Sequence, residues 1–89
     1  NLTGDSNSLT STINSKYTNN SFTITGDSNT LTTTQTGFHG TNSAAGHSIT
    51  SSVIGDNNAI TVLQNGTTNA NSAIINVTGS GAAVSVTQH

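Results

Sequence analysis

The chain has 89 residues and a formal net charge of −2, and only 4% of its residues are charged. Cysteine, proline, methionine and tryptophan are absent, and threonine, serine and asparagine together make up half of the chain. A nucleic-acid-binding protein needs a basic patch against phosphate, and a disulfide framework or a Cys-x-x-Cys metal site needs cysteine, so these classes are excluded. No apolar run approaches the ~20 residues of a membrane-spanning helix, and we expect no membrane insertion.

The length allows a single domain, residues 1–89, with little apolar material for a compact core. Low hydrophobicity is also typical of disordered chains, but these usually carry high net charge and proline, which this chain lacks. The chain begins at Asn1 rather than at methionine, from which we expect a removed secretion signal and an extracellular or cell-surface location.

The sequence contains four copies of a short glycine-led motif, which start at Gly4, Gly26, Gly55 and Gly79. They divide the chain into repeats of residues 4–25, 26–54, 55–78 and 79–89, of which the last is incomplete. The second repeat is the longest because it contains an insertion around Phe38-His39-Gly40. Such a period predicts an architecture in which each repeat contacts mainly its neighbours.

Polar and larger apolar residues alternate along two stretches of each complete repeat. Leu2-Thr3-Gly4 looks like the end of such a stretch, and the following ones cover residues 7–13, 20–26, 29–35, 49–55, 58–64, 73–79 and 82–88. A period of two predicts strands with one buried face, and the glycine and asparagine residues between them suit turns with positive φ. We therefore expect each repeat to be strand, turn, strand, turn.

Side chains of one kind recur at equivalent positions of the repeats, so they form columns when the repeats are aligned. The apolar columns are Leu9, Leu31, Ile60, Val84 and Ile24, Val53, Val77, and the amide columns are Asn7, Asn29, Asn58 and Gln35, Gln64, Gln88. Recurring columns, two strands per repeat and no helical period predict an all-β fold, a β-solenoid of about four two-stranded rungs without caps. Another β fold and a disordered chain are the alternatives.

The third repeat contains Asn58-x-Ile60-x-Val62-x-Gln64-x-Gly66-x-x-Asn69, which resembles the curlin repeat, Ser-x5-Gln-x-Gly-x-x-Asn. The second repeat matches over residues 29–37, and Gln88 keeps the glutamine position in the fourth. The first repeat departs, with Ile13 in place of glutamine and Ser15 in place of glycine, and the second-strand glutamine of curlins is missing. The resemblance implies a secreted subunit of a curli-type extracellular fibre, a functional amyloid of biofilms.

The residues favour a fibre independently of this resemblance. Edge strands recruit other strands unless proline, charge or a covering segment blocks them, and we find no such protection at either end of the repeats. An amide inside a core costs about 1–3 kcal/mol unless it is hydrogen-bonded. Amides in register can donate to the next copy and accept from the previous one, and we expect them to be satisfied completely only if the stack continues across subunits. We therefore expect a homopolymer, with contact to a cell surface or matrix.

Three aspartates, Asp5, Asp27 and Asp56, follow the first three repeat glycines and are expected at one corner of the fold. Carboxylates bind hard cations, which makes this corner a weak candidate metal site, but aspartate in a turn equally well points into water. No serine or threonine has a base and an orienting partner near it, so we expect no enzymatic activity and no cofactor.

The histidines His39, His47 and His89 lack metal-site spacing and are expected to be solvated. Among four Asn-x-Ser/Thr sequons, Asn19 and Asn65 lie near turns and are the better candidates for glycosylation.

Two other functions remain open. Threonines at outward positions form columns, Thr10, Thr32, Thr61 and Thr12, Thr34, which resemble the Thr-x-Thr array of solenoid antifreeze proteins, although Ala59 and Leu63 interrupt the array. This pattern predicts ice binding. The second alternative is a repeat region of a surface adhesin.

Overall fold

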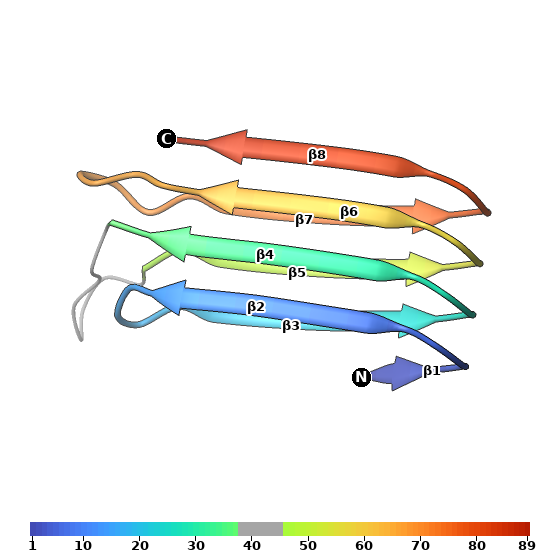
Figure 1. Ribbon diagram of the computed structural model, residues 1–89. Helices are drawn as coiled ribbons and strands as arrows, with labels where there is room; N and C mark the ends of the chain where they lie inside the picture. Colours follow the sequence, from blue (N-terminus) through green and yellow to red (C-terminus); the bar gives the residue numbers. More distant parts are fainter. Residues whose placement is uncertain (38–45) are drawn as a thin grey trace.

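The computed structural model describes residues 1–37 and 46–89, and these residues form eight β-strands and no helix (Figure 1). The strands are β1 (Leu2–Thr3), β2 (Ser8–Asn14), β3 (Asn19–Thr25), β4 (Thr30–Thr36), β5 (Ser48–Ile54), β6 (Ala59–Gln64), β7 (Ser72–Thr78) and β8 (Ala83–Gln88). The prediction of an all-β chain is confirmed for these residues. Each predicted stretch lies within one residue of an observed strand, and the insertion predicted around Phe38-His39-Gly40 lies outside the described residues.

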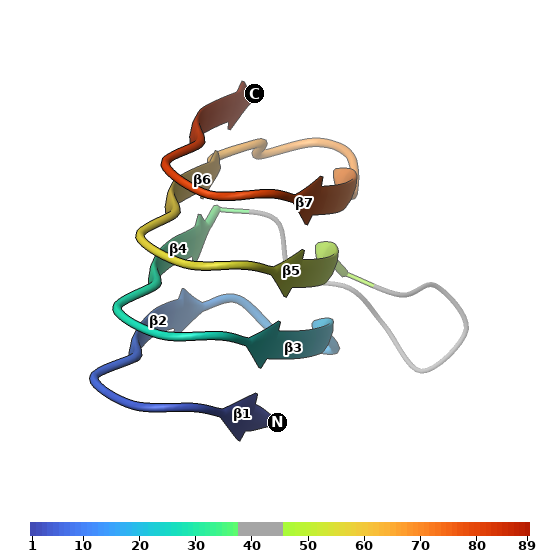
Figure 2. The ribbon, with the colours of Figure 1, turned by 90° about the vertical axis from the view of Figure 1, so that its right-hand side faces the viewer.

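The strands form two parallel sheets, and successive strands along the chain belong alternately to one sheet and to the other. One sheet has the order β1-β3-β5-β7 and the other has the order β2-β4-β6-β8. Consecutive strands therefore lie in different sheets. Each strand pairs in parallel with the strand two places earlier in the chain, which is the equivalent strand of the previous repeat (Figure 2). The views of Figures 1 and 2 show the two sheets facing each other.

The register keeps equivalent residues of the repeats opposite each other. Leu9 pairs with Leu31, Leu31 with Ile60 and Ile60 with Val84, which is the first apolar column of the sequence. In the other sheet Leu2, Ile24, Val53 and Val77 follow one another in the same way. Because side chains alternate between the two faces of a strand, one register places a whole column on the same face.

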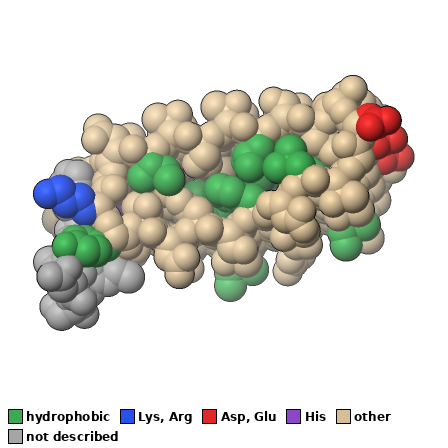
Figure 3. Space-filling model, turned by 90° about the horizontal axis from the view of Figure 1, so that it is seen from below, with side chains coloured by type: hydrophobic (Ala, Val, Ile, Leu, Met, Phe, Trp, Pro, Cys, Tyr) green, Lys and Arg blue, Asp and Glu red, His purple; other side chains and the backbone are tan. Residues whose placement is uncertain are grey.

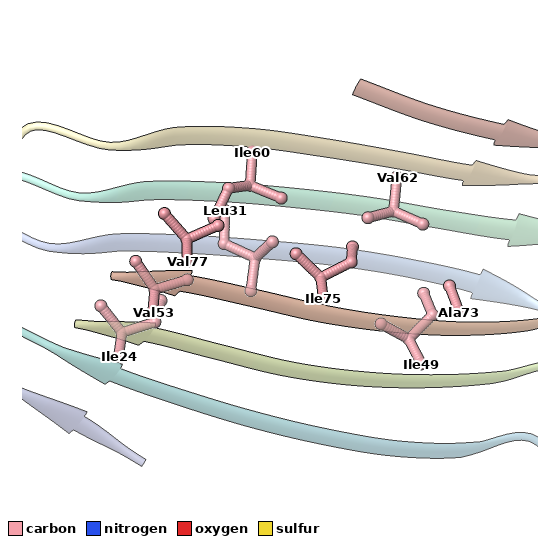
Figure 4. Packing of buried hydrophobic residues seen from close by; sticks show 9 residues of the cluster. All are labelled: Ile24, Leu31, Ile49, Val53, Ile60, Val62, Ala73, Ile75 and Val77. Atoms are coloured by element: carbon pink, nitrogen blue, oxygen red, sulfur yellow. The ribbon is translucent and has the colours of Figure 1, made fainter. Parts of the chain in front are cut away.

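The core lies between the two sheets (Figure 4). Its buried hydrophobic residues come from both of them: Ile24, Leu31, Ile49, Val53, Ile60, Val62, Ala73, Ile75 and Val77. Leu9, Phe22, Ala82, Val84 and Val86 are half-buried against this cluster. The side chains are mostly β-branched, which suits a pleated and half-buried surface.

The turn that opens each repeat depends on its glycine. Gly55 has a φ of 127°, and a Cβ at this position would overlap the backbone carbonyl oxygen of Gly79. Two residues beyond the glycine, Ser6, Ser28 and Asn57 also have positive φ values of 58°. Glycine and asparagine were expected to suit positive φ in these turns, and the two serines show that the equivalent position of the repeat is left-handed with another residue type as well.

Candidate functional site: amide columns and sheet edges

The described residues enclose no pocket and contain no group of three or more His, Cys, Asp or Glu side chains that could hold a metal ion. Within the same ranges, no helix is long and apolar enough to cross a membrane. The features that remain for function are the side-chain columns, the outward faces and the edges of the sheets.

The asparagine column joins successive repeats through the backbone. Asn29 Oδ1 accepts a hydrogen bond from the Asn58 backbone N–H at 3.0 Å, and Asn29 Nδ2 donates to the Gly55 carbonyl at 2.6 Å. Asn7 makes the same two bonds to the second repeat, and Asn58 makes them to Ala82 and Gly79 of the fourth repeat. Each asparagine side chain therefore links the turn in which it lies to the equivalent turn of the following repeat through two hydrogen bonds.

The expectation that the amides need further copies of the chain is wrong for the asparagine column, and also for the glutamine column described next, whose oxygen and nitrogen atoms have partners within the chain. Both polar atoms of Asn7, Asn29 and Asn58 have partners within the chain, and these partners are backbone groups rather than the next amide. The physical reason is geometric, because a short side chain beside a glycine turn reaches the neighbouring main chain.

The glutamine column is a ladder of side chains. Gln35 Nε2 donates to Gln64 Oε1 at 2.8 Å, and Gln64 Nε2 donates to Gln88 Oε1 at 2.8 Å. Gln64 also donates to the Ser48 carbonyl, and Gln88 donates to the Ser72 carbonyl of the opposite sheet. Gln35 and Gln64 are at most 1% exposed, so the bond between these two side chains is made out of contact with water.

Asn20 closes the lower end of the glutamine ladder. Ile13 occupies the equivalent position of the first repeat, and Asn20 Nδ2, from the facing sheet, donates to Gln35 Oε1 at 2.7 Å. Sequence reasoning did not assign this role to Asn20. The signal was an inward amide in the first repeat, the one complete repeat whose first strand lacks glutamine.

The aspartate corner is tied to the main chain. Asp27 Oδ1 accepts a hydrogen bond from the Asp5 N–H at 2.7 Å, and Asp56 Oδ1 accepts one from the Asp27 N–H at 2.8 Å. All three aspartates are exposed, and acidic side chains gather at one end of the molecule while the basic side chain lies at the other (Figure 3). The geometry fits a turn-stabilising role in contact with water.

His47 contradicts the expectation of solvated histidines. Its side chain is completely buried, Nδ1 accepts a hydrogen bond from the Asn71 N–H at 3.0 Å, and Nε2 lies 3.0 Å from the Thr36 carbonyl. These partners assign the neutral tautomer with its proton on Nε2. His89 is exposed, and His39 lies outside the described residues.

The two proposed glycosylation acceptors are both exposed. Asn19 begins β3, and Asn65 follows β6, where its Oδ1 accepts a hydrogen bond from Thr36 Oγ1 at 2.9 Å.

The outward threonines lie on the sheet formed by β2, β4, β6 and β8. Thr10, Thr32 and Thr61 are in register, and Thr12 and Thr34 form a parallel column that continues into Leu63. Exposed hydrophobic side chains on the described surface, such as Ile54 and Ile74, are separated by polar residues.

No protein-family model, no curated protein and no solved structure matches the chain.

Proposed function

We propose that the chain is a β-solenoid segment with one coil per repeat, and that it serves as the structural subunit of a secreted, self-assembling extracellular fibre. In this proposal each rung consists of one strand from each sheet. The observation that carries it is the constant parallel register from the first repeat to the fourth.

A constant register makes the two ends of the described coil complementary. β8 pairs with β6 through one side of its backbone, and β2 pairs with β4 through the opposite side. A second copy stacked in the same sense brings its β2 onto the free side of β8, where it meets the hydrogen-bonding pattern that β4 offers to β6. Free backbone groups at a sheet edge favour this kind of pairing.

The side chains add little resistance to such stacking. The four Lys and Asp residues are all exposed and lie in turns, away from the strands that would pair. The inward positions of β8 and β2 include the half-buried Val84 and Leu9, which would extend the first apolar column. Continuation of the column removes apolar surface from water, which is favourable at ~25 cal/mol per Å².

The resemblance to curlins supports the same proposal, as does a composition without nucleophile–base pairs or cofactor motifs. Secretion and contact with a cell surface or biofilm matrix belong to the proposal through that resemblance.

Electron microscopy and fibre diffraction of the purified chain test the proposal. We expect unbranched filaments with a meridional spacing of about 4.8 Å, and seeds of the filament should remove the lag of assembly. Val84→Lys places a charge on the inward side of β8 and should abolish elongation. Thr87→Lys places the same charge on the outward side of that strand and is the matched control. A chain that stays monomeric at every concentration contradicts the proposal.

Ice binding is a second candidate, favoured by the in-register threonine columns on the exposed face of β2, β4 and β6. A monomer that shapes ice crystals and loses this effect in Thr32→Tyr would support it. The same substitution leaves the sheet edges unchanged, so the fibre proposal expects normal filaments from this variant.

A further inference from the structure

Both amide columns stop inside the repeats, at opposite ends. The asparagine column runs through Asn7, Asn29 and Asn58 and ends at Ala82, whose methyl group has no polar atom to offer. The glutamine column runs from Gln88 down to Gln35 and ends at Ile13, which is 46% exposed. Any strand that pairs beyond these positions, from this chain or from another copy, meets a methyl or a butyl group in place of an amide.

The junctions between successive repeats differ in the number of hydrogen bonds that the amide side chains supply. Between the second and third repeats, Asn29 supplies two hydrogen bonds to the next turn and Gln35 supplies one to Gln64. At a junction of two copies, which rests on the fibre proposed above, Ala82 would lie under Asn7 of the next copy. Gln88 would lie under Ile13 of that copy. None of the three side-chain hydrogen bonds can form there.

We propose that Ala82 and Ile13 are ladder stops, which make the junction between two copies of this chain weaker than every junction within a copy. The backbone register and the contact of Val84 with Leu9 hold the copies together, and the missing amide bonds fix where a filament elongates and where it breaks. The surface of the fourth repeat thus fits a second copy of the chain without the amide bonds that join the repeats within a copy.

Restoring an amide at the stop tests this assignment. Asn58, one repeat below Ala82, donates to a glycine carbonyl and accepts from a backbone N–H. In Ala82→Asn the new side chain has the equivalent groups of the next copy, the Gly4 carbonyl and the Asn7 N–H, within the same reach. Two further hydrogen bonds per junction should lower the critical concentration for assembly about tenfold, measured by sedimentation of filaments at equilibrium.

Ala83→Asn is the matched control, since it adds the same side chain one residue later on the exposed outward side of β8. Its critical concentration should equal that of the wild type. Ile13→Gln tests the other stop and should lower the critical concentration as well, by a smaller factor because it restores one bond. The thermal midpoint of the unassembled chain separates an effect on the junction from an effect on folding.

The outcomes separate the two proposals. Filaments whose critical concentration is the same in Ala82→Asn, Ala83→Asn and the wild type overturn the ladder stops and leave the fibre intact. A wild type that never assembles overturns the fibre, and filaments formed by Ala82→Asn alone would then support the stops. A rise in critical concentration for Ala82→Asn overturns the stops.

Discussion

The inner and outer repeats of the chain share one pattern of residues but differ in burial. In β4 and β6, of the second and third repeats, the inward side chains are buried, whereas those of β2 and β8 are only half-buried or exposed. Leu31 is 1% exposed, while Leu9, one repeat earlier in the same column, is half-buried. The pattern of a strand therefore decides which face turns inward, and its neighbours on both sides decide how far that face is removed from water.

This difference is expected of a protein in which each repeat contacts only the next. Stability is then a sum of repeat and interface contributions, and a change in an inner repeat affects two interfaces where a change in an outer one affects a single interface. Paired substitutions at equivalent positions measure the difference directly, provided that they are compared at a protein concentration below assembly.

The largest expected effect is at the turn glycines. Gly55 and Gly79 have nearly the same φ, 127° and 126°, but a Cβ at Gly55 meets the Gly79 carbonyl and a Cβ at Gly79 has open space around it. Strain from positive φ costs about 1–3 kcal/mol in both alanine variants. Gly55→Ala should lose about 1–3 kcal/mol more, because backbone rather than a flexible side chain must move. Urea denaturation followed by circular dichroism measures both, and equal losses would contradict the comparison.

The leucine pair gives the next largest effect. Leu31→Ala removes a completely buried side chain from between two neighbouring strands and should cost about 2–5 kcal/mol. Leu9→Ala should cost less than half as much, because half-buried Leu9 has a neighbour on one side only and leaves no enclosed cavity. The same denaturation measurement applies, and a Leu9→Ala loss as large as that of Leu31→Ala would show that the first repeat is covered in solution.

The strands and columns could be predicted from the sequence because a period of two is visible in a chain with few kinds of residue. The glycine-led motif also fixed the alignment of the repeats, so the pairing of Leu9 with Leu31 followed from counting. These features depend on local spacing alone.

Features that depend on the facing sheet or on turn geometry could not be predicted. The contact of Asn20 with Gln35 joins the two sheets. His47 is buried between the end of β4, at Thr36, and the segment that precedes β7, at Asn71. Neither contact has a signature in the spacing of the repeats. The positive φ of Ser28 contradicts local preference, and the equivalent residues Ser6 and Asn57 share it.

Gln64, in an inner repeat, and Gln88, in the last repeat, occupy equivalent positions of the glutamine column and compare the two kinds of repeat for a polar side chain. Gln64→Leu keeps the approximate volume but leaves Gln35 Nε2, Gln88 Oε1 and the Ser48 carbonyl without their partner, at a cost of about 2–4 kcal/mol. Gln88→Leu should cost about 1 kcal/mol, because the half-buried Gln88 lies where water can replace its bonds. Thermal unfolding of both variants measures this ratio, and similar midpoints would contradict the role of the buried ladder.

His47 extends the comparison to the turns. His47→Phe fills similar space but leaves the Asn71 N–H and the Thr36 carbonyl without the imidazole, which should cost about 1–3 kcal/mol. His89→Phe changes an exposed residue and should leave the unfolding midpoint unchanged. If both variants have the unfolding midpoint of the wild type, the hydrogen bonds of the imidazole do not stabilise the contact of the end of β4 and the start of β5 with the segment before β7.

The smallest expected effect has the opposite sign. Ser51 is 2% exposed, pairs with Phe22 and Ile75 in its column, and its Oγ has no hydrogen-bond partner among the described residues. A buried hydroxyl without a partner is unfavourable, so Ser51→Ala should stabilise the chain by up to about 1 kcal/mol. Ser52→Ala, on the outward side of β5, is the control and should change stability by less than about 0.5 kcal/mol. A loss of stability in Ser51→Ala would mean that the hydroxyl has a partner, such as an ordered water, and that this core position is satisfied as the amides of the two columns are.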